Sequence, residues 1–312
     1  MKLETPQNRT FREYLILGVK GFCMGAADVV PGVSGGTMAF ILGIYRELIA
    51  SIKSINMDFG RLLLSGKIKD ALGVVSWQFL AAVATGVFAA IFTIAKFLSY
   101  MLSAYPVWVW SFFFGLVLAS AVTICLEIKR WTLKVIIAIL FGTALAFYIV
   151  GQVPVSTPET PWFLFFSGAL AICAMILPGI SGAFILVLLG KYQFVLDAVN
   201  NLDFFTLAVV TSGAVVGLMS FARLLSWLFK KYQKMTIALL VGLMLGSLRK
   251  IWPWKTDMAI YDEKLSEWVV VAQVNMWPGR LDFEVLIGFV LMILGMVMVI
   301  SMKYIANAKS FD

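Results

Sequence analysis

The sequence predicts an all-α polytopic integral membrane protein made of two inverted-topology repeats, each a re-entrant helical hairpin plus three transmembrane helices. Three observations predict this class: an apolar composition, apolar segments long enough to cross a bilayer, and a glycine-rich motif that occurs once in each half. Of the 312 residues, 61% are hydrophobic and 13% are charged, and the mean hydropathy is +0.94. Since soluble domains carry about 25% charged residues, a single soluble core is excluded.

The charged residues that remain are mostly basic, and the net charge is +8. They are spread between apolar segments and form no stripe, so we expect them beside anionic headgroups rather than on nucleic acid. The chain has no histidine, which is the commonest metal ligand and general base. The cysteines lack the spacing of a metal site or a disulfide framework. We therefore expect no metal ion or other cofactor and no nucleic-acid partner.

Ten apolar segments follow one another along the chain. Their approximate spans are 14–30, 37–50, 72–98, 107–126, 132–150, 162–177, 183–199, 204–229, 235–251 and 283–304. Because a helix needs about 20 residues to cross about 30 Å of hydrocarbon, six of these can span it. The other four are short and form two adjacent pairs, 14–30 with 37–50 and 162–177 with 183–199.

The two short pairs are interrupted by the same motif, which reads VPGVSG at 30–35 and LPGISG at 177–182. At a constant offset of 147 residues, Gly21, Gly43 and Tyr45 also meet Gly168, Gly190 and Tyr192. A second match pairs residues 114–120 with 241–247 at an offset of 127. The chain therefore divides into two homologous halves, 1–155 and 156–312, that form one membrane domain.

Each half has an odd number of apolar segments, so the second half should be inverted in the membrane. Lysine and arginine are concentrated in loops 46–70, 127–134 and 230–234 and absent from loops 99–106, 151–161 and 200–203. This alternation follows the positive-inside rule and predicts a multi-pass protein of the cytoplasmic membrane with both termini in the cytoplasm. Loop 252–282, with four tryptophans, is then external. Each short pair either spans the membrane or forms a re-entrant hairpin, and the shortness of the segments favours hairpins whose tips meet near the midplane.

The motif has the composition of an anion site. Proline interrupts the helix, glycine permits tight turns, and a serine or threonine can cap the helix that follows. Free backbone N–H groups at a helix N-terminus suit a phosphate. We predict that the two tips together bind substrate, through the following residues: Pro31, Gly32, Ser34, Gly35, Gly36, Thr37, Pro178, Gly179, Ser181 and Gly182. The alternative is that these glycines only allow a tight helical hairpin.

Three ionisable residues join the predicted substrate site. Asp28 lies on the approach to the first tip, and its counterpart in the second half is Met175. An acid inside a membrane segment is costly, so Asp28 either couples transport to H⁺ or Na⁺ or forms a hydrogen bond within the hairpin. Arg46 and Arg223 are candidate phosphate partners, although the first also suits the membrane interface and the second can extend to it.

The residues quoted so far resemble one bacterial family. The resemblance rests on residues 31–37, 43–45 and 177–182 and on the later run GLMLGSLRK at 242–250, and it covers essentially the whole chain. That family was long catalogued as a domain of unknown function and is now associated with polyprenyl-phosphate transport. The resemblance implies a flippase that returns undecaprenyl phosphate, the lipid carrier of cell-wall precursors, across the bacterial cytoplasmic membrane, and it implies no enzymatic activity.

Two other functions remain open from the residues alone. A secondary transporter of a small anion would use the same pair of tips. A membrane lipid-pyrophosphate phosphatase has inverted repeats and a related Pro-Gly-x-Ser signature, but that family has an arginine in the motif and a pair of glutamates beside it. Residues 33–36 hold no arginine here, and Glu47 and Glu127 lie at segment ends. The oligomeric state is not predicted by any pattern in the chain.

Overall fold

The computed structural model describes residues 9–30, 32–128, 130–262 and 267–308, and these are almost entirely helical. The first half contains α1 (Phe11–Val29), α2 (Gly35–Ile41), α3 (Tyr45–Ser54), α4 (Met57–Leu64), α5 (Ile68–Val74), α6 (Trp77–Ala104), α7 (Pro106–Leu126) and α8 (Leu133–Ile149). The second half contains α9 (Pro161–Ile176), α10 (Gly182–Leu188), α11 (Tyr192–Asn200), α12 (Phe204–Lys231), α13 (Gln233–Ser247), β1 (Lys255–Asp262), β2 (Glu267–Asn275) and α14 (Phe283–Ala308).

The sequence explains where several of these helices begin. Pro106 and Pro161 open α7 and α9 at the first helical position, where a missing N–H costs nothing. Thr132 caps α8 by accepting a hydrogen bond from the Val135 N–H. Asp203 caps α12 by accepting one from the Thr206 N–H.

The multi-pass character predicted from the sequence is confirmed. Four helices are long and apolar enough to cross a membrane, namely α6, α7, α12 and α14. Two more of the expected spans, 132–150 and 235–251, are shorter apolar helices, α8 and α13. Large apolar side chains such as Phe92, which is 81% exposed, cover the outside of the long helices. That outward surface is what a bilayer would cover.

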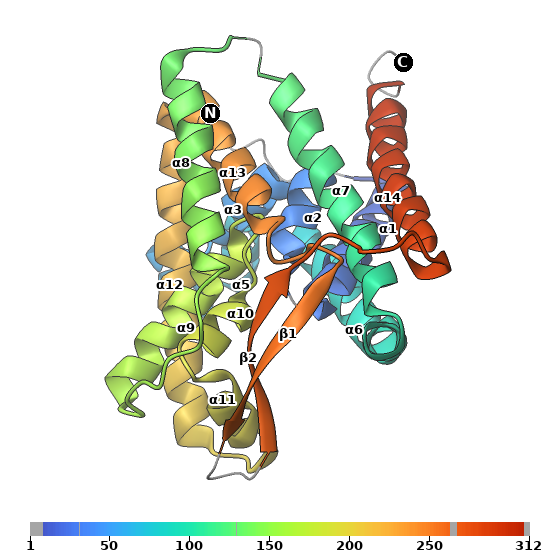
Figure 1. Cartoon of the computed structure of the whole chain (residues 1–312). Coiled ribbons are helices and arrows are strands. Elements are labelled where there is room, and N and C mark those ends of the chain that lie inside the picture. Colours follow the sequence, from blue (N-terminus) through green and yellow to red (C-terminus); the bar gives the residue numbers. More distant parts are fainter. Residues whose placement is uncertain (1–8, 31, 129, 263–266, 309–312) are drawn as a thin grey trace.

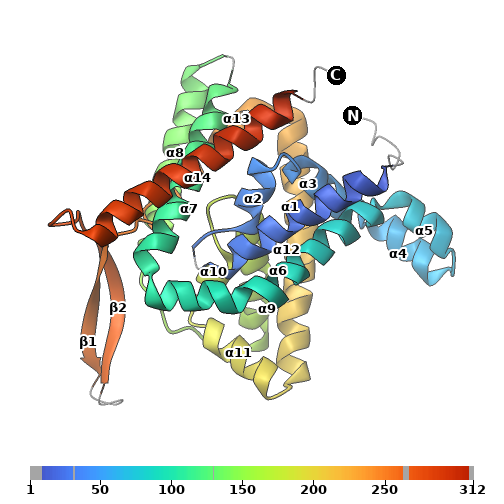
Figure 2. The same cartoon turned by 90° about the vertical axis from the view of Figure 1, so that its right-hand side faces the viewer.

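Eight of the described helices pack in four close pairs. α1 packs against α6 and α9 packs against α12, while α7 packs against α14 and α13 against α8. In the last two pairs, a helix of one half of the chain is the partner of a helix from the other half (Figure 2). Glycines allow these close approaches, because a Cβ at Gly115 would overlap the carbonyl group of Met292 and a Cβ at Gly242 that of Ile139.

The short segments are more broken than the sequence suggested. The segments expected at 37–50 and 183–199 are each two helices, bent by 118° between α2 and α3 and by 107° between α10 and α11. Gly43 and Gly190 lie at these bends with positive φ angles of 73° and 62°. A side chain disfavours this conformation, which is why a continuous helix ends at both places.

Two features depart from the expected elements. Strands β1 and β2 pair antiparallel, and this β-hairpin projects from the helical body (Figures 1 and 2). The loop expected at 46–70 contains α4 and the beginning of α5, and its first residues belong to α3. The alternation of apolar and polar residues was hidden among the tryptophans and charges of loop 252–282, so its strands were missed. The α1 N-terminus and the α14 C-terminus point toward the same end of the molecule, away from this hairpin (Figure 2).

Candidate functional site

The two motif tips touch each other in the middle of the molecule. The Gly179 N–H donates a 2.8 Å hydrogen bond to the Thr37 hydroxyl, and the Ser34 hydroxyl donates to the Met175 carbonyl oxygen at 2.9 Å. Ser34 and Thr37 are fully buried. A Cβ at Gly36 would overlap the Met175 and Ile176 carbonyl oxygens, so only glycine fits there. These motif residues therefore lock one tip to the other.

The first tip uses its N–H groups within itself. The Asp28 carboxylate accepts a 2.6 Å hydrogen bond from the Gly35 N–H, and the Ser34 hydroxyl accepts one of 3.1 Å from the Gly36 N–H. The Asp28 carboxylate thus occupies the position at the α2 N-terminus where the motif predicts a bound anion. Of the two roles considered for Asp28, the hydrogen bond within the hairpin is present. Pro31 lies outside the described residues.

The second tip is different. Ser181 precedes α10 but makes no capping hydrogen bond. Gly179 has a φ of 96° and packs so closely on Leu243 and Ser247 that a Cβ would lie 2.9 Å from an oxygen of each. Pro178 is fully buried, and Gly182 packs against the Ala171 carbonyl group. Ser181 and the first turn of α10 instead border a cavity.

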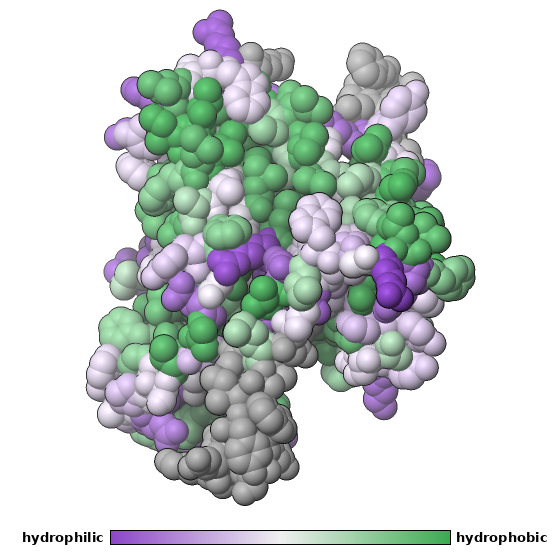
Figure 3. Space-filling view, in the orientation of Figure 1, coloured by the Kyte–Doolittle hydropathy of each residue, from purple (hydrophilic) through white to green (hydrophobic). Residues whose placement is uncertain are grey.

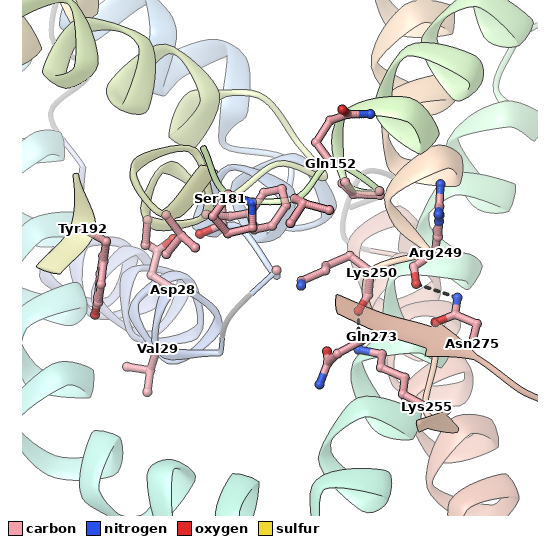
Figure 4. A pocket seen from close by; sticks show the side chains of 18 residues that line it. Asp28, Val29, Gln152, Ser181, Tyr192, Arg249, Lys250, Lys255, Gln273 and Asn275 are labelled. Atoms are coloured by element: carbon pink, nitrogen blue, oxygen red, sulfur yellow. Dashed lines mark hydrogen bonds between the residues drawn. The ribbon is translucent and has the colours of Figure 1, made fainter. Parts of the chain in front are cut away.

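This cavity has a volume of about 510 Å³ and draws its walls from six parts of the chain. The two tips contribute Asp28, Val29, Gly32, Ser181, Ala183, Phe184 and Val187. The remaining walls are the loop 150–154, Tyr192 at the start of α11, the end of α13 with Arg249 and Lys250, and the base of the β-hairpin with Lys255, Gln273 and Asn275. Figure 4 shows this arrangement, with Asp28 and Ser181 on one side and the cations on the other.

Lys250 is the cation that points into this space, toward the side where Asp28 and Ser181 lie (Figure 4). Its ammonium lies 4.9 Å from the centre of the Phe184 ring on α10. Within the described residues, no carboxylate lies within ion-pair distance of it. Its aliphatic stem also covers Gly32, where a Cβ would come within 2.8 Å of the Lys250 Cγ. Lys250 thus presents a positive charge between the two tips.

The other cations of the cavity are held in place by carbonyl groups. The Arg249 guanidinium donates to the Phe147 carbonyl oxygen at 3.0 Å and lies 4.4 Å from the centre of the Phe147 ring. The Lys255 ammonium donates to the Lys250 carbonyl oxygen at 2.5 Å. Asn275 donates to the Arg249 carbonyl oxygen at 2.8 Å, which ties the β-hairpin to the end of α13. Together they make the cavity electropositive.

The predicted site residues are therefore only partly brought together. Asp28, Gly32 and Ser181 line the cavity, whereas Ser34, Gly35, Gly36, Thr37, Pro178, Gly179 and Gly182 form the contacts within and between the tips. Arg46 and Arg223 are exposed and do not line it. The Arg46 guanidinium lies 5.6 Å from the centre of the Phe229 ring instead.

Sequence reasoning missed Arg249 and Lys250 as site residues, although it used them as part of a family resemblance. One signal was present. At the offset of 127 that relates residues 114–120 to 241–247, Arg249 and Lys250 correspond to Val122 and Thr123. Two adjacent positive charges in one half, with uncharged residues at the matched positions of the other, indicate a function that only one half performs.

No carboxylate and histidine cluster suited to a metal ion occurs within the part of the chain that the structure describes.

In the space-filling view, hydrophilic side chains gather near the middle of the face, where α13 ends and the β-hairpin begins (Figure 3). Hydrophobic side chains border them above. The hydrophilic patch thus adjoins an apolar surface on that side.

Comparison with known proteins identifies a family and two relatives. Residues 24–269 match the model of a family described as undecaprenyl phosphate translocase-like. A polyprenyl-phosphate transporter of Vibrio cholerae serotype O1 is 42% identical over 273 residues, covering 88% of each chain. A polyprenyl-phosphate transporter of Staphylococcus aureus is 29% identical over 286 residues, covering 85% of this chain and 96% of the relative. The chain has no significant match among solved structures.

Proposed function

Since the chain belongs to the undecaprenyl phosphate translocase-like family, we propose that it carries a polyprenyl phosphate across the cytoplasmic membrane of a bacterium. The structural observation that carries the proposal concerns Lys250. This cation has no acidic partner among the described residues, and it points into a cavity that both motif tips line. A positive charge with no counter-charge in an apolar protein is costly and indicates an anionic ligand. The phosphate would lie between the Lys250 ammonium and Ser181.

Several groups would share the phosphate. The Lys250 ammonium supplies a charge-assisted hydrogen bond, the Ser181 hydroxyl a neutral one, and the electropositive wall with Arg249 adds a longer-range attraction. The predicted use of both tips is revised in this proposal. The second tip faces the substrate, whereas the first contributes Asp28 and Gly32 to the cavity wall and otherwise holds the second in place.

The placement of the cavity favours a lipid over a small anion. A headgroup site set within an apolar face can receive a phosphate while its hydrocarbon tail stays in the bilayer, whereas a small anion needs only an aqueous path. In Figure 3, hydrophobic side chains border the hydrophilic patch above, which is where such a tail could leave the site. A phosphatase would need a base and a metal or cationic clamp around the scissile bond. We propose a transporter without enzymatic activity.

We infer further that the two halves, 1–155 and 156–312, are inverted repeats that exchange their last helices. The packing of α1 on α6 corresponds to that of α9 on α12, and the packing of α7 on α14 to that of α13 on α8. Gly86, packed on the Gly18 carbonyl group, has its equivalent 127 residues later in Gly213, packed on that of Phe165. Inverted repeats of this kind support alternating access around a central site.

In such a cycle, the cavity beside the β-hairpin is the external entrance, and undecaprenyl phosphate would return from the outer to the inner leaflet with both chain termini in the cytoplasm. We propose that Asp28 couples this movement to protons. A bound phosphate and an ionised Asp28 carboxylate would repel each other across the cavity, whereas a protonated carboxyl would not. The Arg46 and Arg223 side chains remain candidates for phosphate contacts in an inward-facing state.

The test is transport in liposomes that contain the purified protein. Wild-type protein should move a labelled polyprenyl phosphate between leaflets and should not take up inorganic phosphate. Lys250→Gln should lose most of this activity, while Lys231→Gln, which removes another lysine that lies over aromatic rings, should retain it. Uptake of inorganic phosphate without lipid movement would instead establish the small-anion transporter.

A further inference from the structure

A second hollow lies beside the cationic cavity, and the two have a common wall. It has a volume of about 340 Å³ and is lined by the rings of Trp110 on α7 and of Trp254 and Trp277, which flank the β-hairpin. Lys255 and Gln273 line both spaces. The hollow thus adjoins the proposed phosphate site and differs from it in chemistry.

The wall between the two spaces is built around Lys255. Its ammonium donates to the Lys250 carbonyl oxygen at 2.5 Å and lies 4.2 Å from the centre of the Trp110 ring. The same side chain therefore borders the electropositive cavity at one side and an aromatic surface at the other. A ligand that fills both spaces would have an anionic group at one end and an apolar part beginning directly beside it.

The lining of the second hollow is mostly apolar and partly open. Pro106 and Val107 contribute from the first turn of α7, and Met276 from the strand end. Trp277 is 76% exposed and Met276 is 50% exposed. Tryptophan faces provide a large contact area for flat, apolar groups at a low cost in conformational entropy. Such faces match the planar, methyl-branched units of an isoprenoid.

We propose that the hollow bounded by Trp110, Trp254 and Trp277 binds the phosphate-proximal isoprene units of the lipid substrate and thereby selects prenyl lipids over other anionic lipids. This inference rests on the proposed function and adds the part of the substrate that a phosphate site alone cannot recognise. The occupant follows from the adjacency of the two spaces, which share Lys255 and Gln273, because the first isoprene units of a bound polyprenyl phosphate must lie next to its phosphate.

The inference is tested by competition against a labelled polyprenyl phosphate bound to the purified protein. Two competitors are compared: an unlabelled long-chain polyprenyl phosphate and inorganic phosphate, which has no tail. In Trp110→Ala and Trp277→Ala, the affinity for the long-chain competitor should fall by about tenfold, equivalent to about 1.4 kcal/mol. The affinity for inorganic phosphate should stay unchanged. Trp162→Ala is the matched control, since Trp162 is 60% exposed on α9 and lines neither space.

Trp277→Phe should restore most of the long-chain affinity, which separates loss of an aromatic face from loss of the fold. Equal weakening of both competitors would overturn the inference, because the tryptophans would then act on the phosphate site or on stability. Unchanged affinities in both alanine variants would overturn it as well. If wild-type protein binds no polyprenyl phosphate, the proposed function itself fails. That result differs from wild-type binding that stays unchanged in the tryptophan variants, which would overturn this inference alone.

Discussion

The two motif tips have nearly the same sequence and the same backbone path, yet they are equipped for different tasks. At the first tip, Asp28 and Ser34 occupy the N–H groups of Gly35 and Gly36. At the second tip, the position matched to Asp28 is Met175, Ser181 makes no capping bond, and Lys250 faces the opening. In the proposed mechanism, these few side chains decide that the second copy of the motif binds substrate and the first supports it.

The largest effect expected from this asymmetry concerns Lys250 and Thr123, its matched position in the first half. Lys250→Gln removes a charge-assisted hydrogen bond worth about 1.5–3 kcal/mol, so polyprenyl-phosphate transport should fall by about tenfold to more than a hundredfold. Thr123→Val, at the matched position of the first half, removes only a hydroxyl that bonds the Ala119 carbonyl oxygen within its own helix. Transport rates of the two variants in liposomes should differ accordingly, and equal losses would break the comparison.

The next effect concerns the contact between the tips. Thr37→Val removes the acceptor of the buried Gly179 N–H and should destabilise the protein by about 1–3 kcal/mol. Thermal unfolding in detergent should show a lower midpoint, while Thr93→Val, on the exposed face of α6, should leave it unchanged. A midpoint that does not move would mean that the tips are not held together by this bond.

The substitution Asp28→Asn tests the role of the negative charge that only the first tip carries. The amide oxygen can still accept from the Gly35 N–H, so the hairpin should stay folded. The substitution removes the negative charge that opposes a bound phosphate, so polyprenyl phosphate should bind several-fold tighter at neutral pH. Transport by this variant should no longer respond to a pH gradient across the liposome membrane. A variant that remains fully driven by the gradient would remove Asp28 from the coupling mechanism.

The smallest effect separates the two bends. Gly43→Ala has open space around its new methyl group and should cost about 1–2 kcal/mol, from the positive φ alone. Gly190→Ala carries the same strain and also brings its Cβ to 2.6 Å from the Val155 carbonyl oxygen, so it should cost more. Chemical denaturation of the two variants should rank them in this order. The reverse order would mean that the contact with the Val155 carbonyl oxygen does not add to the cost at the second bend.

Much of the fold could be predicted because membrane helices are recorded directly in the sequence. Apolar length located the long helices, and the repeated Pro-Gly-x-Ser-Gly motif located both tips. The β-hairpin was missed because strands of ordinary length inside a mixed polar and aromatic loop give a weak periodic signal. The bends at Gly43 and Gly190 were visible as matched glycines, but a glycine alone does not show that the chain turns by more than 100° there.

The site was predicted less well, for a physical reason. The motif suggested an anion at both helix N-termini, but whether a side chain already fills such a position depends on the tertiary path of α1, which brings the Asp28 carboxylate to Gly35. The approach of Lys250 to the second tip likewise depends on the packing of α13. Lys250 lies 72 residues after Pro178 in the sequence. The close packing of Gly35 against Asp28 also means that a bulky residue there would disrupt the hairpin itself.

The central claim is that Lys250 holds the substrate phosphate beside the second tip. The most direct test is equilibrium binding of a labelled polyprenyl phosphate to wild-type, Lys250→Arg and Lys250→Gln protein, with the neutral polyprenol as a competitor. The account predicts that polyprenol does not displace the phosphate-bearing lipid, that the arginine variant keeps most of the affinity, and that the glutamine variant loses at least about tenfold. Wild-type affinity in Lys250→Gln, in protein that remains folded, would contradict it.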